Sequence, residues 1–445
     1  MHRHLLFARP ARLALAVAGA LTLAATVLPA ASADATGTGD TGQGARAAAK
    51  TGVFVRGKQV RHWNGDGTSS YRFKTRGVIV EGFQWPVEAM QACEKKAGLG
   101  HKGTDKADRF CERHLDAIDY FDHTGDYAED SLTAMQRARR HWKANTVRFN
   151  LSQAMLDPAS TLYKKTLSGS STTWGQTYMQ RLVAAVHEAE ANGMVVILAV
   201  FNHRNAQAGL VTVDGKTLLS YDAKSGLPTN RTARAVSTLG ERFGSDKEVL
   251  IDLYNEPFTQ KGQTVTTYVN GDQKSTPRIS GINRLAEKAR DAGVTTPLIT
   301  QWADLSQLPV GKITDENMIF SSHPFLGDGV RTGGGDANWR RRFGDLARTR
   351  PVVLTAWNAT PLVKHKNGKT TNTWCRHSGI DLADQFVKYV RRNDVGLVGF
   401  AFDVNQSMIK NFARFRDQPY GLTSCTKRGG AGVVIKRMFV NQAKG

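Results

Sequence analysis

The stretch Val249-Leu-Ile-Asp-Leu-Tyr-Asn-Glu-Pro257 is an apolar run that ends on an amide, a carboxylic acid and a proline. The apolar residues predict a buried strand. Pro257 cannot donate a ladder hydrogen bond, so we expect the strand to end there. A proline also favours an extended backbone at the residue before it, which is Glu256. A carboxyl group held at a strand end beside the Asn255 amide suits proton transfer to a substrate oxygen.

Apolar runs of strand length recur along the chain, and helical patterns separate most of them. In the pattern at 173–191 the apolar residues fall on one helical face. Strands joined through helices pair in parallel, because each crossover needs a helix. The chain therefore predicts an α/β fold, a (β/α)8 TIM barrel with loop insertions and a small N-terminal hairpin cap at 52–73. An open doubly wound sheet is the alternative, although no Gly-x-Gly-x-x-Gly follows the first strand. The expected strands are 76–82, 145–150, 194–201, 249–254, 297–302, 317–323, 351–356 and 396–402, and the expected helices are about 131–143, 173–191, 232–243, 281–292 and 382–392.

The N-terminal residues have the pattern of an export signal. Arginines precede an apolar core, and Ala31-Ser32-Ala33 is a small-x-small cleavage site. We expect residues 1–33 to be a signal peptide cleaved near Ala33 and the protein to be secreted into the extracellular space. A membrane anchor is the alternative. Residues 34–50 are rich in Gly, Ala and Thr and predict a flexible linker, which leaves 51–445 for the barrel domain. No other apolar stretch in the sequence is long enough to span a bilayer.

Four cysteines fit an oxidising compartment. Nearest-neighbour pairing would join Cys93 to Cys111 and Cys375 to Cys425, which is one of three possible connectivities. No Cys-x-x-Cys pair occurs, and the histidines are not spaced as a ligand set, so we expect no metal and no cofactor.

The formal net charge of +21 is compatible with an anionic partner such as a cell-wall polymer. A solvated basic surface is the equally weighted alternative. The basic runs are scattered and no nucleic-acid motif appears, so we expect no nucleic-acid partner.

Polar residues stand at the predicted carboxyl ends of the strands, where barrel enzymes carry their chemistry. The chain there resembles glycoside hydrolase family 5, the cellulase-like branch of the retaining (β/α)8 glycosidases, over roughly residues 70 to 410. The resemblance rests on Val147-Arg148 in the second strand, Asn255-Glu256-Pro257 in the fourth, His323 with an aromatic two residues later in the sixth, and an aromatic in the eighth.

The resemblance implies a role for each matching residue. Glu256 would be the general acid/base, and Asn255 would bind the sugar 2-hydroxyl. Arg148 would keep a partner carboxylate ionised, and His323 would orient the cluster. Phe325 stands where a tyrosine is usual, and Asn202 and His203 stand where a histidine is usual. The aromatic candidates for stacking on sugar rings are Trp302, Trp339, Trp374 and Phe402, each with core or loop packing as the alternative.

The nucleophile of the family is a glutamate at the end of the seventh strand, and the aligned residue here is Ala356. The chain contains no Glu after Glu316. Asp403 and Asp304 are possible replacements, with ion pairing to Arg or Lys as the alternative for both. We expect a water, an anion or a nearby Asp to take the lost position beside Arg148, since a buried unpaired guanidinium is costly.

Three functions stay open on the sequence. The first is a secreted family 5-like protein that binds a β-linked polysaccharide or oligosaccharide, with retaining hydrolysis impaired by the missing nucleophile. The second is an active glycosidase that uses Asp403, Asp304 or a water in place of Ala356. The third is a basic wall-associated carbohydrate-binding protein.

Overall fold

The computed structural model describes residues 51–84, 134–166, 171–202, 210–213, 216–219, 226–325, 335–359, 362–364, 370–372, 379–403, 407–411, 416–420 and 430–444. The expected signal peptide, the linker, His203, Trp374 and all four cysteines lie outside these residues. Within the described part, no helix is both long and apolar enough to cross a membrane.

Eight parallel strands form the central sheet, in the order β11-β10-β9-β6-β5-β4-β15-β12. A parallel bridge between Phe320 and Val352 brings the two end strands together, so the sheet curls into a barrel. The (β/α)8 prediction is confirmed, and each predicted strand is found in its place. The strands are β4 (Arg76–Val80), β5 (Thr146–Ser152), β6 (Val195–Phe201), β9 (Val249–Asp252), β10 (Leu298–Gln301), β11 (Met318–Ser321), β12 (Val353–Trp357) and β15 (Gly396–Gly399).

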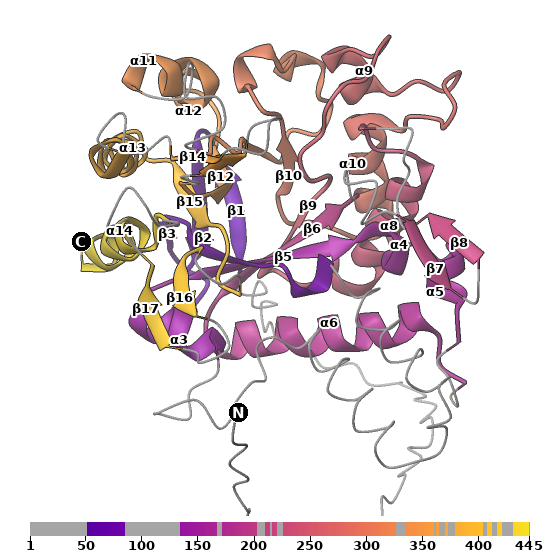
Figure 1. Ribbon diagram of the computed structural model, residues 1–445, viewed down its shortest axis with the longest axis horizontal. Helices are drawn as coiled ribbons and strands as arrows, with labels where there is room; N and C mark the ends of the chain where they lie inside the picture. Colours follow the sequence, from indigo (N-terminus) through magenta and orange to yellow (C-terminus); the bar gives the residue numbers. More distant parts are fainter. Residues whose placement is uncertain are drawn as a thin grey trace, which may run out of the picture. The chain divides into compact units, whose positions relative to one another are not determined.

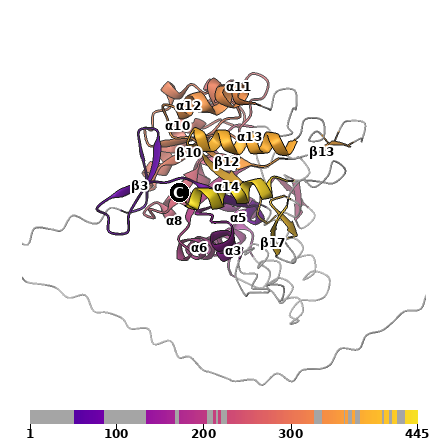
Figure 2. The same cartoon turned by 90° about the vertical axis from the view of Figure 1, so that its left-hand side faces the viewer.

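Helices lie outside the strands, with α6 and α3 on one side and α13 and α14 side by side on another (Figures 1 and 2). Helix α6 begins where predicted because Thr173 and Gln176 form a reciprocal capping box. The barrel helices are α3 (Ala134–His141), α6 (Trp174–Ala191), α8 (Asn230–Phe243), α10 (Gly281–Asp291), α13 (Gly379–Arg392) and α14 (Gly432–Lys444).

The predicted N-terminal hairpin cap is present as β1 (Val53–Arg56) and β2 (Gln59–Trp63), and a third strand, β3 (Ser70–Arg72), extends it to an antiparallel sheet. It lies at the amino-terminal ends of the barrel strands. The Val53 N–H donates to the carbonyl of Lys247, just before β9, at 3.0 Å. His62 hydrogen-bonds both carboxylate oxygens of Glu248, at 2.8 and 3.0 Å.

Short elements occupy the connections between barrel strands. The helical ones are η1 (Gly82–Gln84), α4 (Gln153–Leu156), α5 (Thr161–Lys164), α9 (Val265–Asn270), η3 (Leu305–Gln307), η4 (Val310–Lys312), α11 (Asp336–Trp339), the π-helical η5 (Arg340–Gly344) and α12 (Asp345–Ala347). Three hairpins are β7 (Leu210–Val213) with β8 (Lys216–Leu219), β13 (Leu362–Lys364) with β14 (Thr370–Asn372), and β16 (Ile409–Asn411) with β17 (Arg416–Pro419).

The period-two alternation of the strands creates two apolar layers. One set of side chains faces the helices, and the other fills the barrel interior. The interior positions become polar near the carboxyl ends: on β9 Leu250 is followed by Asp252, and on β10 Ile299 is followed by Gln301. The strand pattern therefore places a polar layer directly beneath the mouth of the barrel.

Candidate active site

A cleft of about 230 Å³ opens at the carboxyl ends of β9, β10 and β11. It brings together Glu256, Trp302, His323 and Phe325, four of the residues that the sequence singled out. Trp302 is mostly buried, with its ring tilted against Tyr268 at 5.0 Å between centroids. The cleft is completed by Pro257, Gln301, Ala303 and Arg342.

The backbone of Glu256 is left-handed, with φ of 49°, which corrects the extended conformation expected before a proline. A non-glycine residue at positive φ is strained and persists only where its surroundings hold it. Here the Glu256 N–H donates to Gln301 Oε1 at 3.1 Å, and the carboxylate Oε1 lies 3.1 Å from His323 Nδ1. These contacts fix the carboxyl group at the cleft, where about a third of the side chain stays exposed.

His323 has a partner at both ring nitrogens. Its Nε2 lies 2.9 Å from the Thr355 hydroxyl, which in turn lies 2.6 Å from Ser321 Oγ. Burial is the main cause that lowers the pKa of His323, against the opposing effect of Glu256, so the neutral imidazole is favoured. The ring therefore links Glu256 to β12 through its two nitrogens, and the orienting role that the resemblance implies stays a prediction.

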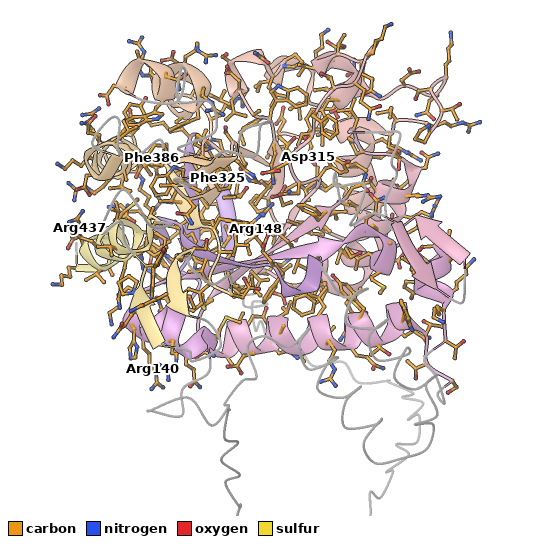
Figure 3. The ribbon with its side chains drawn as sticks, viewed as in Figure 1. Arg140, Arg148, Asp315, Phe325, Phe386 and Arg437 are labelled. Atoms are coloured by element: carbon orange, nitrogen blue, oxygen red, sulfur yellow. The ribbon has the colours of Figure 1, made fainter. Side chains whose placement is uncertain are left out.

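Arg148 lies beneath the mouth and is completely buried. Figure 3 marks it near the centre of the strands, with Phe325 above it in that view. Its Nη2 donates to Asp252 Oδ2 at 2.9 Å and to Asn255 Oδ1 at 2.7 Å. Its Nη1 donates to Asn150 Oδ1 at 2.5 Å. The guanidinium is thus paired with an Asp, but this Asp lies on β9 rather than on β12, and Gln301 Nε2 also donates to its carboxylate.

Ala356 is buried in the interior layer, one residue after Thr355 on β12. The register of β12 against β15 shifts between Leu354 and Trp357, so the simple alternation is interrupted there. Phe325 and Phe400 pack edge to face, 5.6 Å apart, against the apolar cluster that contains Ala356. The Ala356 methyl group on β12 thus belongs to the same apolar cluster as Phe325, which follows β11, and Phe400, which follows β15.

Two further carboxyl groups meet at the ends of β4 and β15. Asp403 Oδ2 accepts from the N–H groups of Glu81 and Gly82 at 2.7 and 2.9 Å, and its buried Oδ1 has no hydrogen-bond partner in the described part of the chain. Burial, with the charges of Asp403 and Glu256, raises the pKa of Glu81 to about 8. Burial raises the pKa of Asp403 to about 7. Both groups therefore hold protons well above the usual range of a carboxylic acid.

Several of the residues proposed from the sequence lie away from the cleft. Phe402 is buried and packs edge to face on Trp142, because β15 ends at Gly399 and its alternation does not reach this residue. Phe400 is the aromatic that meets Phe325. Trp339 is buried against Phe386 rather than open for stacking. Asn202 is buried and donates to the Tyr254 hydroxyl at 3.1 Å.

Asp304 caps a short helix and forms an ion pair. It accepts from the N–H of Ser306 at 3.1 Å as the N-cap of η3, and it pairs with Arg341. This contact is the ion pair that the sequence offered as its alternative. Within the described residues, no cluster of three or more His, Cys, Asp or Glu side chains is arranged to hold a metal ion.

Sequence reasoning gave no role to Asp252, Gln301, Thr355 and Glu81. Asp252 carried a usable signal, because it is a charged residue inside the buried run 249–253 and such a residue needs a buried partner. Glu81 stands at the end of the first predicted strand, 76–82, so its position near the mouth could be predicted. Its closeness to Asp403, which is distant in sequence, required the closed barrel.

Comparisons with known proteins agree with this geometry. Residues 116–406 match the family model described as cellulase (glycosyl hydrolase family 5). No curated protein sequence matches the chain.

Among solved structures, an endocellulase from Pyrococcus horikoshii in complex with cellotetraose is 14% identical with a TM-score of 0.52, over 88% of this chain and 99% of that one. The catalytic domain of an endoglucanase from Thermobifida fusca, also with cellotetraose, is 15% identical with a TM-score of 0.48, over 87% and 97%. The first likeness supports the fold alone. The family model covers well over half of the sequence, and the chain therefore belongs to the cellulase family, glycosyl hydrolase family 5.

Proposed function

We propose that this protein is secreted, binds a β-linked glucan in the cleft beside Glu256, and does not cleave it by the retaining route of its family. One observation carries the proposal. Glu256 is held at the cleft by His323 and Gln301, whereas the position expected for the nucleophile is the buried methyl group of Ala356. Cellotetraose in the structure of the endocellulase from Pyrococcus horikoshii, which shares this fold, supports a glucan as the ligand.

The chemistry explains why one carboxyl group is insufficient. A retaining glycosidase needs a second carboxylate about 5–5.5 Å from the first to form the glycosyl-enzyme intermediate. Glu256 could protonate the departing oxygen, but the Ala356 methyl cannot attack the anomeric carbon. Loss of one member of such a pair lowers the rate by several orders of magnitude. The cleft and Glu256 still offer an apolar wall and a proton donor to a bound sugar.

A second candidate is an inverting hydrolase that uses a water molecule, with Glu81 or Asp403 as the base at a pH above their pKa values of about 8 and about 7. The favouring observation is that the charge of Glu256 acts on Glu81, so both carboxyl groups belong to one electrostatic site. Such enzymes space their carboxyl groups about 6.5–9.5 Å apart, which leaves room for water. Asp304 is a weaker choice, because it is engaged with Ser306 and Arg341.

The test combines binding and cleavage. Isothermal titration of the full-length protein with cellotetraose should give a saturable heat, while chromatography of the same mixture shows intact tetrasaccharide after many hours. Trp302→Phe should weaken binding. The matched change Trp63→Phe, in the N-terminal cap, should leave it unchanged. Absence of binding to cello-, manno- and xylo-oligosaccharides would refute the binding function. Rapid cleavage with retained configuration would refute the loss of the retaining route.

A further inference from the structure

A second cleft, of about 450 Å³, lies on the opposite face of the barrel, at the amino-terminal ends of its strands. Arg76 begins β4, Glu248 directly precedes β9, and His62 and Tyr71 come from the N-terminal cap. The carboxyl-end mouth contributes no residue to this cleft.

Two arginines that line the cleft, Arg76 and Arg139, have no acidic partner among the described residues. Arg76 Nε donates to the carbonyl of Lys143 at 2.9 Å, and Arg139 Nη1 donates to the carbonyl of Ala144 at 3.3 Å. Burial and the charge of Arg139 lower the pKa of Arg76, so the two guanidinium groups are close enough to repel each other. A negatively charged ligand between them would relieve that repulsion and form charge-assisted hydrogen bonds.

The two glutamates that line the cleft, Glu190 and Glu248, carry less negative charge than two free carboxylates would. Glu248 is already paired with His62, whose pKa is raised chiefly by that hydrogen bond. Burial and a hydrogen bond with Asp246 raise the pKa of Glu190 to about 8, so Glu190 keeps its proton at neutral pH. The cleft as a whole therefore favours an anion, while the carboxyl oxygens of Glu190 and Glu248 remain suited to accept from hydroxyl groups.

An aromatic ring completes the cleft. Tyr71 is 47% exposed, and its ring lies 5.4 Å from that of His62. Exposed aromatic faces with nearby polar groups are suited to pack on the apolar face of a pyranose. A cavity of this size is in the range that accommodates a small ligand.

We propose that this cleft binds a pyranose that carries an anionic group, a uronic acid or a sugar phosphate, at the face of the barrel opposite Glu256. The anionic group lies between Arg76 and Arg139, the sugar ring lies against Tyr71, and hydroxyl groups donate to Glu248. The high positive charge of the chain would assist the approach of such a ligand or of a polymer containing it. This site does not depend on the function proposed for the Glu256 cleft.

The experiment is titration of the full-length protein with glucuronate, glucose 6-phosphate, glucose and inorganic phosphate at one ionic strength. Glucuronate or glucose 6-phosphate should bind saturably, and the difference between them identifies the preferred anionic group. Glucose and inorganic phosphate should each bind at least about tenfold more weakly, because each lacks half of the recognised features. Equal binding of inorganic phosphate and glucose 6-phosphate would overturn the sugar part of the proposal.

The variants use neighbouring arginines of α3. Arg139→Gln should weaken binding about tenfold or more. Arg140→Gln changes the net charge by the same amount and is the matched control. Arg140 is exposed, does not line the cleft and is marked at the edge of the molecule in Figure 3. Binding to this variant should therefore be unchanged. If both variants weaken binding equally, only the overall charge matters and the proposal is wrong. If Arg139→Gln does not fold, Tyr71→Ala tests the aromatic ring independently, because Tyr71 is exposed. Unchanged binding to Tyr71→Ala would also count against the site.

Discussion

Arg148 and Asp252 form a completely buried ion pair, with 2.9 Å between Arg148 Nη2 and Asp252 Oδ2. In the family resemblance this arginine would support the nucleophile. Here its charge is balanced by Asp252 of β9, which is separated from β5 by β6, and its Nη atoms also donate to Asn150 and Asn255. The barrel can therefore hold Ala356 on β12 without leaving an unpaired cation beneath the mouth. Asp252 therefore supplies the counter-charge that a completely buried guanidinium needs.

The first prediction concerns this pair. Arg148→Met should lower the free energy of unfolding by about 3–5 kcal/mol, because Asp252 would be left buried without a counter-charge. The double variant Arg148→Met with Asp252→Leu should recover much of that loss. Urea unfolding followed by circular dichroism measures both. Arg340→Met breaks the exposed pair with Asp345 and should leave the unfolding midpoint unchanged. If the double variant is no more stable than Arg148→Met, the unpaired charge of Asp252 is not the reason for the lower stability of Arg148→Met.

The second prediction concerns the pH dependence of stability. In an unfolded chain Glu and Asp have pKa values of about 4.3 and 3.9. In the folded protein Glu81 and Asp403 keep their protons to about 8 and about 7. Between these pH values the folded state binds more protons than the unfolded state. The contribution of Glu81 and Asp403 to stability is therefore full below about pH 4 and is lost as the pH rises to about 8.

Glu81→Gln removes one of these groups. Its free energy of unfolding should therefore change less between pH 5 and pH 8 than that of the unmodified protein, as measured by urea unfolding at both pH values. Glu287→Gln, an exposed change on α10, is the control and should preserve the original slope. Parallel profiles for all three proteins would mean that Glu81 titrates as an ordinary exposed glutamate.

The third prediction concerns a carboxyl group introduced at Ala356, the position that the family resemblance assigns to the nucleophile. Ala356→Glu should create measurable retaining cleavage of an aryl β-cellobioside, and Ala356→Gln should not, because it has the same shape without the nucleophilic charge. Both should lose about 1–3 kcal/mol of stability, since the longer side chain enters the layer against Phe325 and Phe400. Activity is followed by release of the aryl group and stability by urea unfolding. If both variants fold and bind cellotetraose yet stay equally inactive, the aromatic pair holds the new carboxylate out of position.

The barrel could be predicted from the sequence because its signals are local. Each buried strand is an apolar run, and α6 carries its own capping box at Thr173. The same logic located Glu256 and His323, since barrel chemistry lies at strand ends. These residues do share one cleft in the structure.

Other features depend on packing between strands, which no local pattern reports. The pairing of Arg148 with Asp252 needs the inward faces of β5 and β9 to meet across β6. The left-handed backbone of Glu256 contradicts the local preference before Pro257, because Gln301 and His323 hold it in place. The expected eighth strand ran to residue 402 and so placed Phe402 at the site, but β15 ends at Gly399 and its alternation of inward and outward side chains does not extend to Phe402.

Azide rescue is the sharpest test of whether Glu256 donates a proton while no protein carboxylate attacks the sugar. Two aryl β-cellobiosides, one with a good and one with a poor leaving group, are incubated with and without high concentrations of azide, and NMR gives the anomeric configuration of the products. We expect negligible cleavage without azide and an α-glycosyl azide with it. Glu256→Gln should strongly reduce the azide product from the substrate with the poor leaving group, which needs protonation, and should reduce it much less from the other substrate. Azide-independent release of sugar with retained β configuration would contradict this, because it would show that a protein carboxylate performs the attack.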